Sequence, residues 1–190
     1  MNHNNTFYFL RHGETIKDPN KLTVDWSLTP ETSEILDTLA DNKNFSEITT
    51  IYTSHEDKAI KSASPFVSKL NIPLVKMEGL EEVHRGDKYL TDEEFKRQKR
   101  EKLEDRDSNP DGGESSNEAL RRFMTVIEEI NNNHNNENIL ISSHGTILAL
   151  YFCYIKNDFS NIYDYWESIP FCGVGIIKNQ KVIKDFTENN

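Results

Sequence analysis

The chain has 190 residues and a formal net charge of −10 at pH 7. This length fits one domain with a full hydrophobic core, and no stretch approaches the ~18 continuous apolar residues of a membrane span. The acidic composition disfavours nucleic acid and anionic membranes as partners, because both would be repelled. The polar start MNHNNT lacks the charged and apolar regions of a signal peptide, so we expect a cytoplasmic protein.

The N-terminal part of the chain is predicted to run from strand through loop to helix. Residues 6–10 (TFYFL) are aromatic and apolar without helical spacing, which is typical of a buried strand. Residues 16–27 are polar and contain Pro19, which indicates a loop. Thr29 and Pro30 suit an N-cap and a first helical position, so we expect a helix from there. Its predicted inner face consists of Ile35, Leu36 and Leu39.

The next segments continue the alternation of strand and helix. Residues 48–53 (ITTIYT) and 72–77 (IPLVKM) have the composition of strands. Between them we expect a helix that begins near Ser54, and Pro65 within it can produce a kink.

A highly charged segment follows at residues 87–110. Thr91 and Glu94 have the spacing of a capping box, which predicts a helix. Its apolar residues are few, chiefly Phe95 and Leu103, so we interpret it as an exposed helical cap over the main domain. Two interpretations stay open: a lid over a site, or a solvated surface helix without a role in function.

The last part of the chain restores the alternation. Gly112 and Gly113 indicate a turn, and Ser115 with Glu118 forms a second capping-box pattern, for a helix to about Ile130. We then expect a polar loop at 131–138, a strand at 138–142, a buried helix after it, and a hairpin of VGIIK and KVIKDF. This alternation predicts a single α/β domain over residues 1–190, a three-layer α/β/α sandwich with a mostly parallel sheet.

The cysteines, Cys153 and Cys172, form no CxxC pair, and we expect two reduced, packed thiols.

Two short motifs share the same local context. FYFL is followed by Arg11, His12 and Gly13, and ILIS is followed by a serine, His144 and Gly145. Ligands of open α/β sheets bind outside the carboxyl ends of strands, so both histidines are predicted at that edge. The glycines let the backbone bend and a ligand approach, and the helix after the second corner directs free N–H groups there. For one such histidine alone, the simpler interpretation is a half-buried residue at the end of a strand. Two histidines in the same context favour an anion-binding site.

Five segments carry a resemblance to a known family. They are LRHGET (10–15), YTSHEDKAIKSA (52–63), LEEVHRG (80–86), PDGGES (110–115) and ISSHGTI (141–147). In this order they resemble segments of the histidine phosphatase superfamily, also called the phosphoglycerate mutase-like family. The matches extend from residue 7 to about residue 150, and together they are much more specific than any one of them.

The resemblance implies a mechanism through a phosphohistidine. His12 would attack phosphorus as a neutral imidazole, because nearby cations disfavour its protonated form. Arg11 and His144 would bind the phosphoryl oxygens and stabilise charge that develops in the transition state. Glu82 would protonate the leaving oxygen and then activate water, and only its place in the L-x-E-x-x-x-G pattern distinguishes it from Glu81. No metal or other cofactor is implied.

The resemblance also implies residues that bind the phosphate or the substrate. They are Arg11, Gly13, Thr15, Lys58, Arg85, Gly145 and Thr146. Arg85 or His84 can restore the positive charge lost at Lys58 or contact the rest of the substrate, or both residues can belong to a solvated turn.

Three positions depart from the family's pattern. Lys58 stands in place of an arginine and offers a point charge instead of a planar two-pronged contact. An ordinary surface position on a helix is its alternative interpretation. Asp18 stands where many members have a phosphate-contacting asparagine, and an acid there repels phosphate. Thr32 replaces a common glycine, with an effect that we expect to be local.

The function that these residues favour is a metal-independent phosphomonoesterase that hydrolyses a small phosphorylated metabolite. One alternative is phosphoryl transfer of the phosphoglycerate mutase type, which needs a closed pocket that excludes water. Another is non-catalytic binding of phosphate-bearing ligands, which Lys58 and Asp18 keep open. A phosphoprotein substrate is disfavoured because the acidic surface repels acidic phosphopeptides. The sequence indicates neither the substrate nor the oligomeric state.

Overall fold

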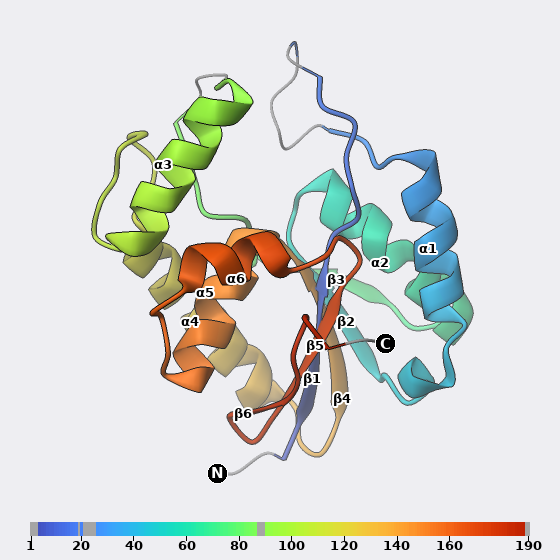
Figure 1. The fold of residues 1–190 in the computed structure, drawn as a ribbon. Helices are drawn as coiled ribbons and strands as arrows, with labels where there is room; N and C mark the ends of the chain where they lie inside the picture. The colour runs from blue at the N-terminus through green and yellow to red at the C-terminus, as the bar shows by residue number, and fades with distance from the viewer. Residues whose placement is uncertain (1–3, 19, 21–25, 87–89, 189–190) are drawn as a thin grey trace.

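The computed structural model describes residues 4–18, 20, 26–86 and 90–188. The start of the chain, Pro19 with part of the predicted loop, and the first residues of the charged segment lie outside the described residues. Within the described ranges, helices lie on both sides of a six-stranded sheet (Figure 1). None of the described helices is long and apolar enough to cross a membrane.

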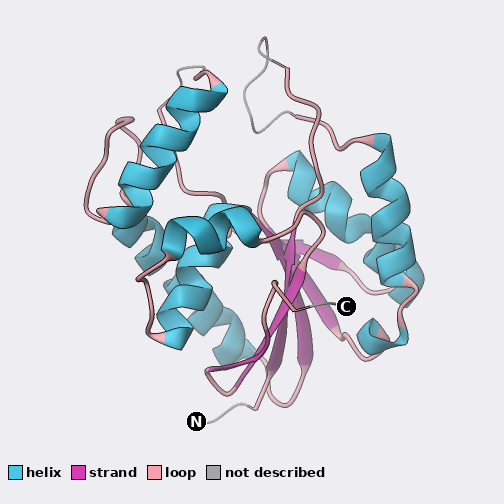
Figure 2. Cartoon of the chain, viewed as in Figure 1, coloured by secondary structure: helices cyan, strands magenta, loops and turns pink. Residues whose placement is uncertain are grey.

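The strands pair in the order β3-β2-β4-β1-β5-β6. Their bounds are β1 Thr6–Arg11, β2 Thr50–Thr53, β3 Leu74–Lys76, β4 Asn138–Ser143, β5 Val174–Lys178 and β6 Lys181–Lys184. The first four strands in chain order are parallel, whereas β5 is antiparallel to β1 and β6 is antiparallel to β5. The sheet is therefore mostly parallel, and the predicted C-terminal hairpin forms its antiparallel edge (Figure 2).

The helices form the two outer layers. Their bounds are α1 Pro30–Ala40, the short 3₁₀ helix η2 Lys43–Phe45, α2 Asp57–Leu70, α3 Asp92–Glu104, α4 Ser116–Asn133, α5 Gly145–Lys156 and α6 Ile162–Ser168. In Figure 1, α1 and α2 lie on one side of the sheet and α4, α5 and α6 on the other. Helix α3 packs against α6 at the outside of this second layer. The predicted three-layer α/β/α sandwich is confirmed.

Strand β1 is buried on both of its faces. Phe9 packs against Phe123 of α4 and Phe152 of α5, with ring centroids 6.4 and 5.7 Å apart. The next residue, Leu10, points to the other face and belongs to the cluster that contains Leu36 and Phe66. Successive side chains of a strand alternate between faces, so a central strand between two helical layers is apolar at every position. The continuous apolar run before Arg11 follows from this burial.

The local signals for helix starts are confirmed. The Thr29 side chain accepts the backbone N–H of Thr32 at the start of α1, with Pro30 in the first turn. Both predicted capping boxes form, one at Thr91 for α3 and one at Ser115 for α4. Such caps satisfy N–H groups that have no partner inside the helix, so a few residues suffice to encode them.

Several expectations about burial and length are wrong. Ile35 is 55% exposed, and Leu36 alone of the three predicted inner residues of α1 is fully buried. Helix α6 was not expected, and α4 continues to Asn133 into the predicted polar loop. The expected helix after β2 begins at Asp57, later than predicted. These differences arise because packing against other elements decides which apolar residues are covered and where a helix ends.

The register between β1 and β4 brings the two histidine corners together. The strands are parallel neighbours, and Arg11 lies opposite Ser143. The backbone N–H of His12 donates to the Ser143 carbonyl at 2.9 Å, which extends the pairing one residue beyond β1. His12 and His144 therefore leave the carboxyl edge of the sheet side by side.

Candidate active site

The centre of the site is the histidine pair, His12 and His144, whose ring centroids lie 5.1 Å apart. Both side chains are buried, with His144 fully inaccessible. His12 Nδ1 lies 2.7 Å from the carbonyl oxygen of Gly13. A carbonyl only accepts, so the proton of a neutral His12 is held on Nδ1, and the lone pair for attack is on Nε2.

The surroundings of His12 keep its imidazole neutral. Burial lowers the pKa of His12 well below its usual range, and the neighbouring groups His144, Lys58 and Arg11 act in the same direction. The Gly13 carbonyl opposes this change but does not reverse it. Because only the neutral imidazole has a lone pair on Nε2, the site holds His12 in the form that a nucleophile requires.

His144 has one ring nitrogen with a partner among the described residues and one without. Its Nε2 lies 2.8 Å from the hydroxyl oxygen of Ser54, at the end of β2. Burial and the charge of Lys58 lower the pKa of His144 to about 3, so the ring is neutral. If the Ser54 hydroxyl donates to Nε2, the proton is on Nδ1, a buried atom with no partner among the described residues. A phosphoryl oxygen would satisfy that proton.

Arg11 also lacks a partner at one buried atom. Its guanidinium donates to the Ile169 carbonyl and lies over the Phe171 ring, with 4.0 Å to the centroid. Its Nε is buried without a partner among the described residues. A Cβ on Gly145 would lie 2.9 Å from this Nε, so the close approach of Arg11 requires glycine there. Gly145 serves packing, since its φ is not positive.

Gly13 has a similar packing role on the other side of the site. Its backbone N–H donates to the Ser62 hydroxyl of α2 at 2.9 Å. A Cβ on Gly13 would overlap the Thr32 methyl group at 1.9 Å. Thr32, which departs from the family's pattern, fills the space over Gly13, so its effect is local as expected.

Glu82 is held by the N-terminus of α5. Its two carboxylate oxygens accept the backbone N–H groups of Thr146, Ile147 and Val83 and the Thr146 hydroxyl, at 2.9–3.1 Å. Burial opposes ionisation, but the charge of Lys99 and these hydrogen bonds outweigh it and keep the pKa of Glu82 well below its usual range. Glu81 accepts instead from Gly79 N–H and His55, away from α5. The geometry therefore favours Glu82 over Glu81 as the carboxylate of the site.

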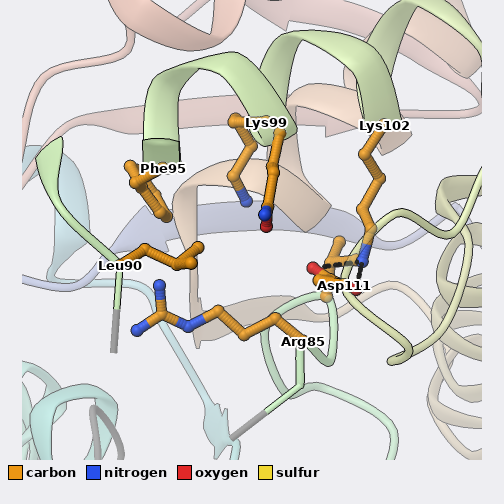
Figure 3. Close-up of a pocket in the computed structure, with 8 residues that line it drawn as sticks. Arg85, Leu90, Phe95, Lys99, Lys102 and Asp111 are labelled. Atoms are coloured by element: carbon orange, nitrogen blue, oxygen red, sulfur yellow. Dashed lines mark hydrogen bonds and ion pairs between the residues drawn. The ribbon is translucent and has the colours of Figure 1, made fainter. Parts of the chain in front are cut away.

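Lys99 connects the cap helix α3 to the same helix N-terminus. Its Nζ donates to the Thr146 hydroxyl at 2.8 Å, and this hydroxyl donates to Glu82. Most residues of α3 are exposed, as expected, but Lys99 and Lys102 are only 9% and 2% exposed. Figure 3 shows both side chains extending from α3 toward the domain. The sequence of this segment predicts a solvated, charged helix, because the pattern of charges does not indicate which lysine side chains are buried.

The burial of Lys99 predicts a pH-dependent contribution to stability. Burial lowers the pKa of Lys99 to about 8, below its value in an unfolded chain. Above pH 8 the folded protein therefore releases this proton before the unfolded chain does, and the free energy of unfolding rises with pH. We expect wild type to gain on the order of 2 kcal/mol relative to Lys99→Met between pH 8 and 10. Urea denaturation would measure this difference.

Lys96 provides the matched control for that measurement. It lies on the same helix with 63% of its side chain exposed, beside Glu167. We expect Lys96→Met to follow wild type at every pH. An equal pH dependence in Lys99→Met and wild type would contradict the assignment of the lowered pKa to Lys99.

Arg85 faces a small cavity under α3. The cavity has a volume of about 10 Å³, room for about one water molecule. In Figure 3 the Arg85 side chain extends beneath the helix toward Leu90 and Phe95, and its guanidinium carbon is 5.4 Å from the Phe95 ring centroid. Asp111 beside it is paired with Lys102 at 2.7 Å. Arg85 thus lies under the cap helix, near enough to Glu82 for their charges to interact.

Two other predicted residues lie along the loop after β1. Thr15 forms a backbone bridge with Leu28, and within the described ranges its side chain makes no hydrogen bond to the histidine pair. Asp18 accepts the backbone N–H of Asn20 at 3.0 Å, which is a turn interaction. Gly145 begins α5, while the Thr146 groups expected to bind phosphate are engaged by Glu82.

Lys58 lies inside the site, and its partner Glu56 was missed by sequence reasoning. Lys58 is buried at the start of α2, and its Nζ lies 2.6 Å from Glu56 Oε2. The other oxygen of Glu56 is 3.3 Å from His144 Nε2 and accepts the Glu82 N–H at 3.2 Å. Lys58 is therefore no ordinary surface residue. The one signal in the sequence was that Glu56 stands two positions before Lys58, in the segment that resembles a phosphate-binding segment.

Comparison with known proteins identifies the family of the chain. The family model of the histidine phosphatase superfamily (branch 1) matches residues 7–181, and the chain belongs to this superfamily. Among curated protein sequences, none matches the chain.

Solved structures of similar fold include YhfR and two phosphatases. YhfR of Bacillus stearothermophilus has a TM-score of 0.76 at 23% identity, over 97% of this chain and all of that one. Mycobacterial glucosyl-3-phosphoglycerate phosphatase Rv2419c has a TM-score of 0.74 at 16% identity, over 93% and 94% of the chains. A phosphoserine phosphatase mutant from Entamoeba histolytica, in complex with phosphoserine, has a TM-score of 0.71 at 19% identity, over 90% and 89%. At these identities the likeness concerns the fold.

Proposed function

We propose that the protein is a phosphomonoesterase that hydrolyses a small phosphorylated metabolite through a phosphohistidine on His12. One observation carries the proposal. A neutral imidazole is surrounded by buried nitrogen atoms of Arg11 and His144 that have no partner among the described residues. Buried donors are costly to leave unsatisfied, and a phosphoryl group supplies the oxygens that they lack. Membership in the superfamily supports the same reaction.

The proposed reaction begins with the attack of His12 Nε2 on phosphorus. Arg11 and His144 Nδ1–H donate to the phosphoryl oxygens and stabilise their growing charge. The leaving oxygen takes a proton from Glu82, and the same carboxylate later accepts a proton from the water that hydrolyses the phosphohistidine. Glu82 is ionised in the unliganded site, so it takes up its proton as the phosphoryl group adds negative charge nearby.

The substrate is proposed to be small because the cap reaches close to the site. Lys99 of α3 contacts Thr146 directly, and Arg85 lies under the same helix. We propose residues 87–110 as the cap of a single domain, with Arg85 available to a polar group of the substrate. The names of two structural neighbours also give small phosphorylated substrates, phosphoserine and glucosyl-3-phosphoglycerate.

The test is the release of inorganic phosphate from p-nitrophenyl phosphate and a panel of small phosphate monoesters. EDTA is present throughout, at pH 5 to 8. Turnover of at least one ester supports the proposal. If no ester is hydrolysed but 2- and 3-phosphoglycerate interconvert, the protein is a mutase. If neither reaction occurs while inorganic phosphate binds, it is a non-catalytic phosphate binder.

Lys58 provides a test of the phosphate-binding set. Lys58→Ala removes a buried cation beside the histidine pair, and we expect kcat/KM to fall about 10–100-fold. Lys58→Arg keeps the charge and offers a two-pronged contact, so we expect it to retain or raise activity. Steady-state kinetics with p-nitrophenyl phosphate measure both effects.

Lys61 is the matched control for Lys58. It lies three residues further on α2, with 49% of its side chain exposed and an ion pair to Asp57. We expect Lys61→Ala to have wild-type kinetics. Unchanged kinetics in Lys58→Ala would remove Lys58 from the phosphate site.

A further inference from the structure

One aromatic side chain beside the histidine pair lies outside the hydrophobic core. Phe171, in the loop between α6 and β5, is 41% exposed and belongs to neither hydrophobic cluster of the described residues. Its ring centroid lies 4.0 Å from Cζ of Arg11 and 5.8 Å from the centroid of the His12 ring. A single exposed apolar residue is ordinary on a protein surface. This one contacts both the proposed nucleophile and the arginine beside it.

The loop that carries Phe171 is tied to the end of β1. Phe171 and Cys172 are the central residues of a turn, which the backbone N–H of Gly173 closes at 3.1 Å. Cys172 has a φ of 58°, at a turn position where glycine or asparagine is usual. The backbone N–H of Arg11 donates to the Gly173 carbonyl at 3.0 Å, and that of Cys172 donates to the His12 carbonyl at 3.4 Å. The backbone therefore fixes the place of the Phe171 ring relative to Arg11.

The contacts of Arg11 leave donors for a ligand. One guanidinium N–H donates to the Ile169 carbonyl, and the backbone of Gly145 approaches the same guanidinium with no room for a Cβ. The Nε of Arg11 is buried without a partner among the described residues. An aromatic ring attracts a cation through its π face. Unlike a carboxylate, the Phe171 ring neither neutralises the charge nor occupies the donors that phosphoryl oxygens would use.

We propose that Phe171 is a positioning residue of the phosphate site, whose ring holds the guanidinium of Arg11 ready for the phosphoryl group. An arginine side chain that is already held loses little conformational freedom when phosphate binds. The ring also keeps water from one side of the cation, which strengthens the attraction between Arg11 and phosphoryl oxygens. This inference rests on the proposed function, because Phe171 acts through Arg11 on the same phosphoryl group.

The experiment compares wild type, Phe171→Leu and Phe171→Tyr at pH 7. Leucine removes the ring but stays apolar, whereas tyrosine keeps an aromatic face. The measurements are the Kd of inorganic phosphate by calorimetry and kcat/KM for p-nitrophenyl phosphate. In Phe171→Leu we expect phosphate affinity and kcat/KM to fall about 3–30-fold, the range of one cation–π contact. In Phe171→Tyr we expect both to stay within about threefold of wild type.

Stability and a distant aromatic residue provide the controls. Phe171→Leu should have the wild-type midpoint in urea, because its ring lies outside both hydrophobic clusters. A lower midpoint with unchanged phosphate affinity would assign Phe171 a structural role and overturn the proposal. Tyr154→Leu removes a ring of similar exposure, 44%, from the last turn of α5, away from the site. We expect this variant to keep wild-type affinity and kinetics.

A double-mutant cycle tests whether Phe171 acts through Arg11. Without the guanidinium, the ring has no cation to hold. In an Arg11→Gln background we therefore expect Phe171→Leu to change phosphate affinity less than about twofold. The full loss in that background would overturn the positioning role. The single variants decide the matter even if Arg11→Gln binds phosphate too weakly to measure, and Phe171→Met replaces Phe171→Leu if the latter does not fold.

The outcomes separate this inference from the proposed function. Wild-type affinity in Phe171→Leu, or equal losses in Phe171→Leu and Phe171→Tyr, overturns the role of Phe171 and leaves the proposed function intact. If wild type binds phosphate but hydrolyses no ester, the proposed function fails, while the expected order of affinities still supports Phe171. Neither binding nor hydrolysis by wild type overturns both.

Discussion

His12→Ala is expected to abolish phosphate release, with kcat at least about 10³-fold below wild type. Alanine removes the nitrogen that attacks phosphorus, and no neighbouring group replaces it: the other neutral imidazole, His144, has its Nε2 turned to Ser54. The measurement is hydrolysis of p-nitrophenyl phosphate with EDTA, from pH 5 to 8. Wild type should be active in the presence of EDTA. If this activity is lost in His12→Ala, catalysis through His12 is established.

A covalent readout distinguishes loss of chemistry from loss of fold. Phosphate label transferred from substrate to protein should appear in quenched wild type and be absent in His12→Ala. His134→Gln is the control, since His134 lies before the opposite end of β4 and contacts Tyr52 at 2.8 Å. It should keep wild-type kcat. Activity of His12→Ala within about tenfold of wild type would contradict a nucleophilic role.

Glu82→Gln is expected to reduce activity in a way that depends on the leaving group. A general acid contributes about 10²–10⁴-fold when the leaving oxygen needs a proton. We therefore expect kcat/KM to fall at least about 100-fold for an alkyl phosphate, and much less for p-nitrophenyl phosphate, whose phenolate leaves unprotonated. Kinetics with the two substrates measure the ratio. Equal losses for both would mean that Glu82 positions α5 without donating a proton.

Glu82→Gln should also lower stability. The carboxylate accepts hydrogen bonds from four donors. The NH₂ group of a glutamine amide is itself a donor, so it cannot accept from the donors that it faces. Leaving one or two buried N–H groups unsatisfied costs about 1–3 kcal/mol, measurable by urea denaturation. Glu81→Gln is the control for kinetics, because its carboxylate binds Gly79 and His55 outside the histidine pair.

The free energy of unfolding at acidic pH should also depend on the Glu82 carboxylate. The pKa of Glu82 is lowered in the folded protein, so its contribution is complete above the unfolded value near pH 4.3. It is lost as pH falls below that value toward the folded pKa. Wild type and Glu82→Gln should therefore converge in stability on acidification.

Much of the fold could be predicted because its signals are local. The N-caps at Thr29, Thr91 and Ser115 depend on hydrogen bonds between residues three positions apart. Strands β1 and β4 follow from continuous apolar runs between two helical layers. Helix α6 was missed because its seven residues are too few to show a helical period.

The histidine pair could also be predicted, since two strand ends with the same motif meet at one sheet edge if their strands are neighbours. The surrounding charges could not. Lys99 is 47 residues from the Thr146 that it contacts, and Glu56 lies 26 residues before the Glu82 backbone that it binds. Nothing in the local pattern of a charged segment tells which of its side chains will be buried.

The amino-acid sequence by itself determined the order of strands and helices, the helix caps and the two histidine corners, because each depends on neighbours within a turn of helix or a few strand residues. Only the tertiary structure decided the chemistry around them: which glutamate binds α5, which lysines are buried, and that Glu56 faces Lys58. The physical reason is that pKa values and charge balance depend on burial and on distances across the fold, which chain spacing does not specify.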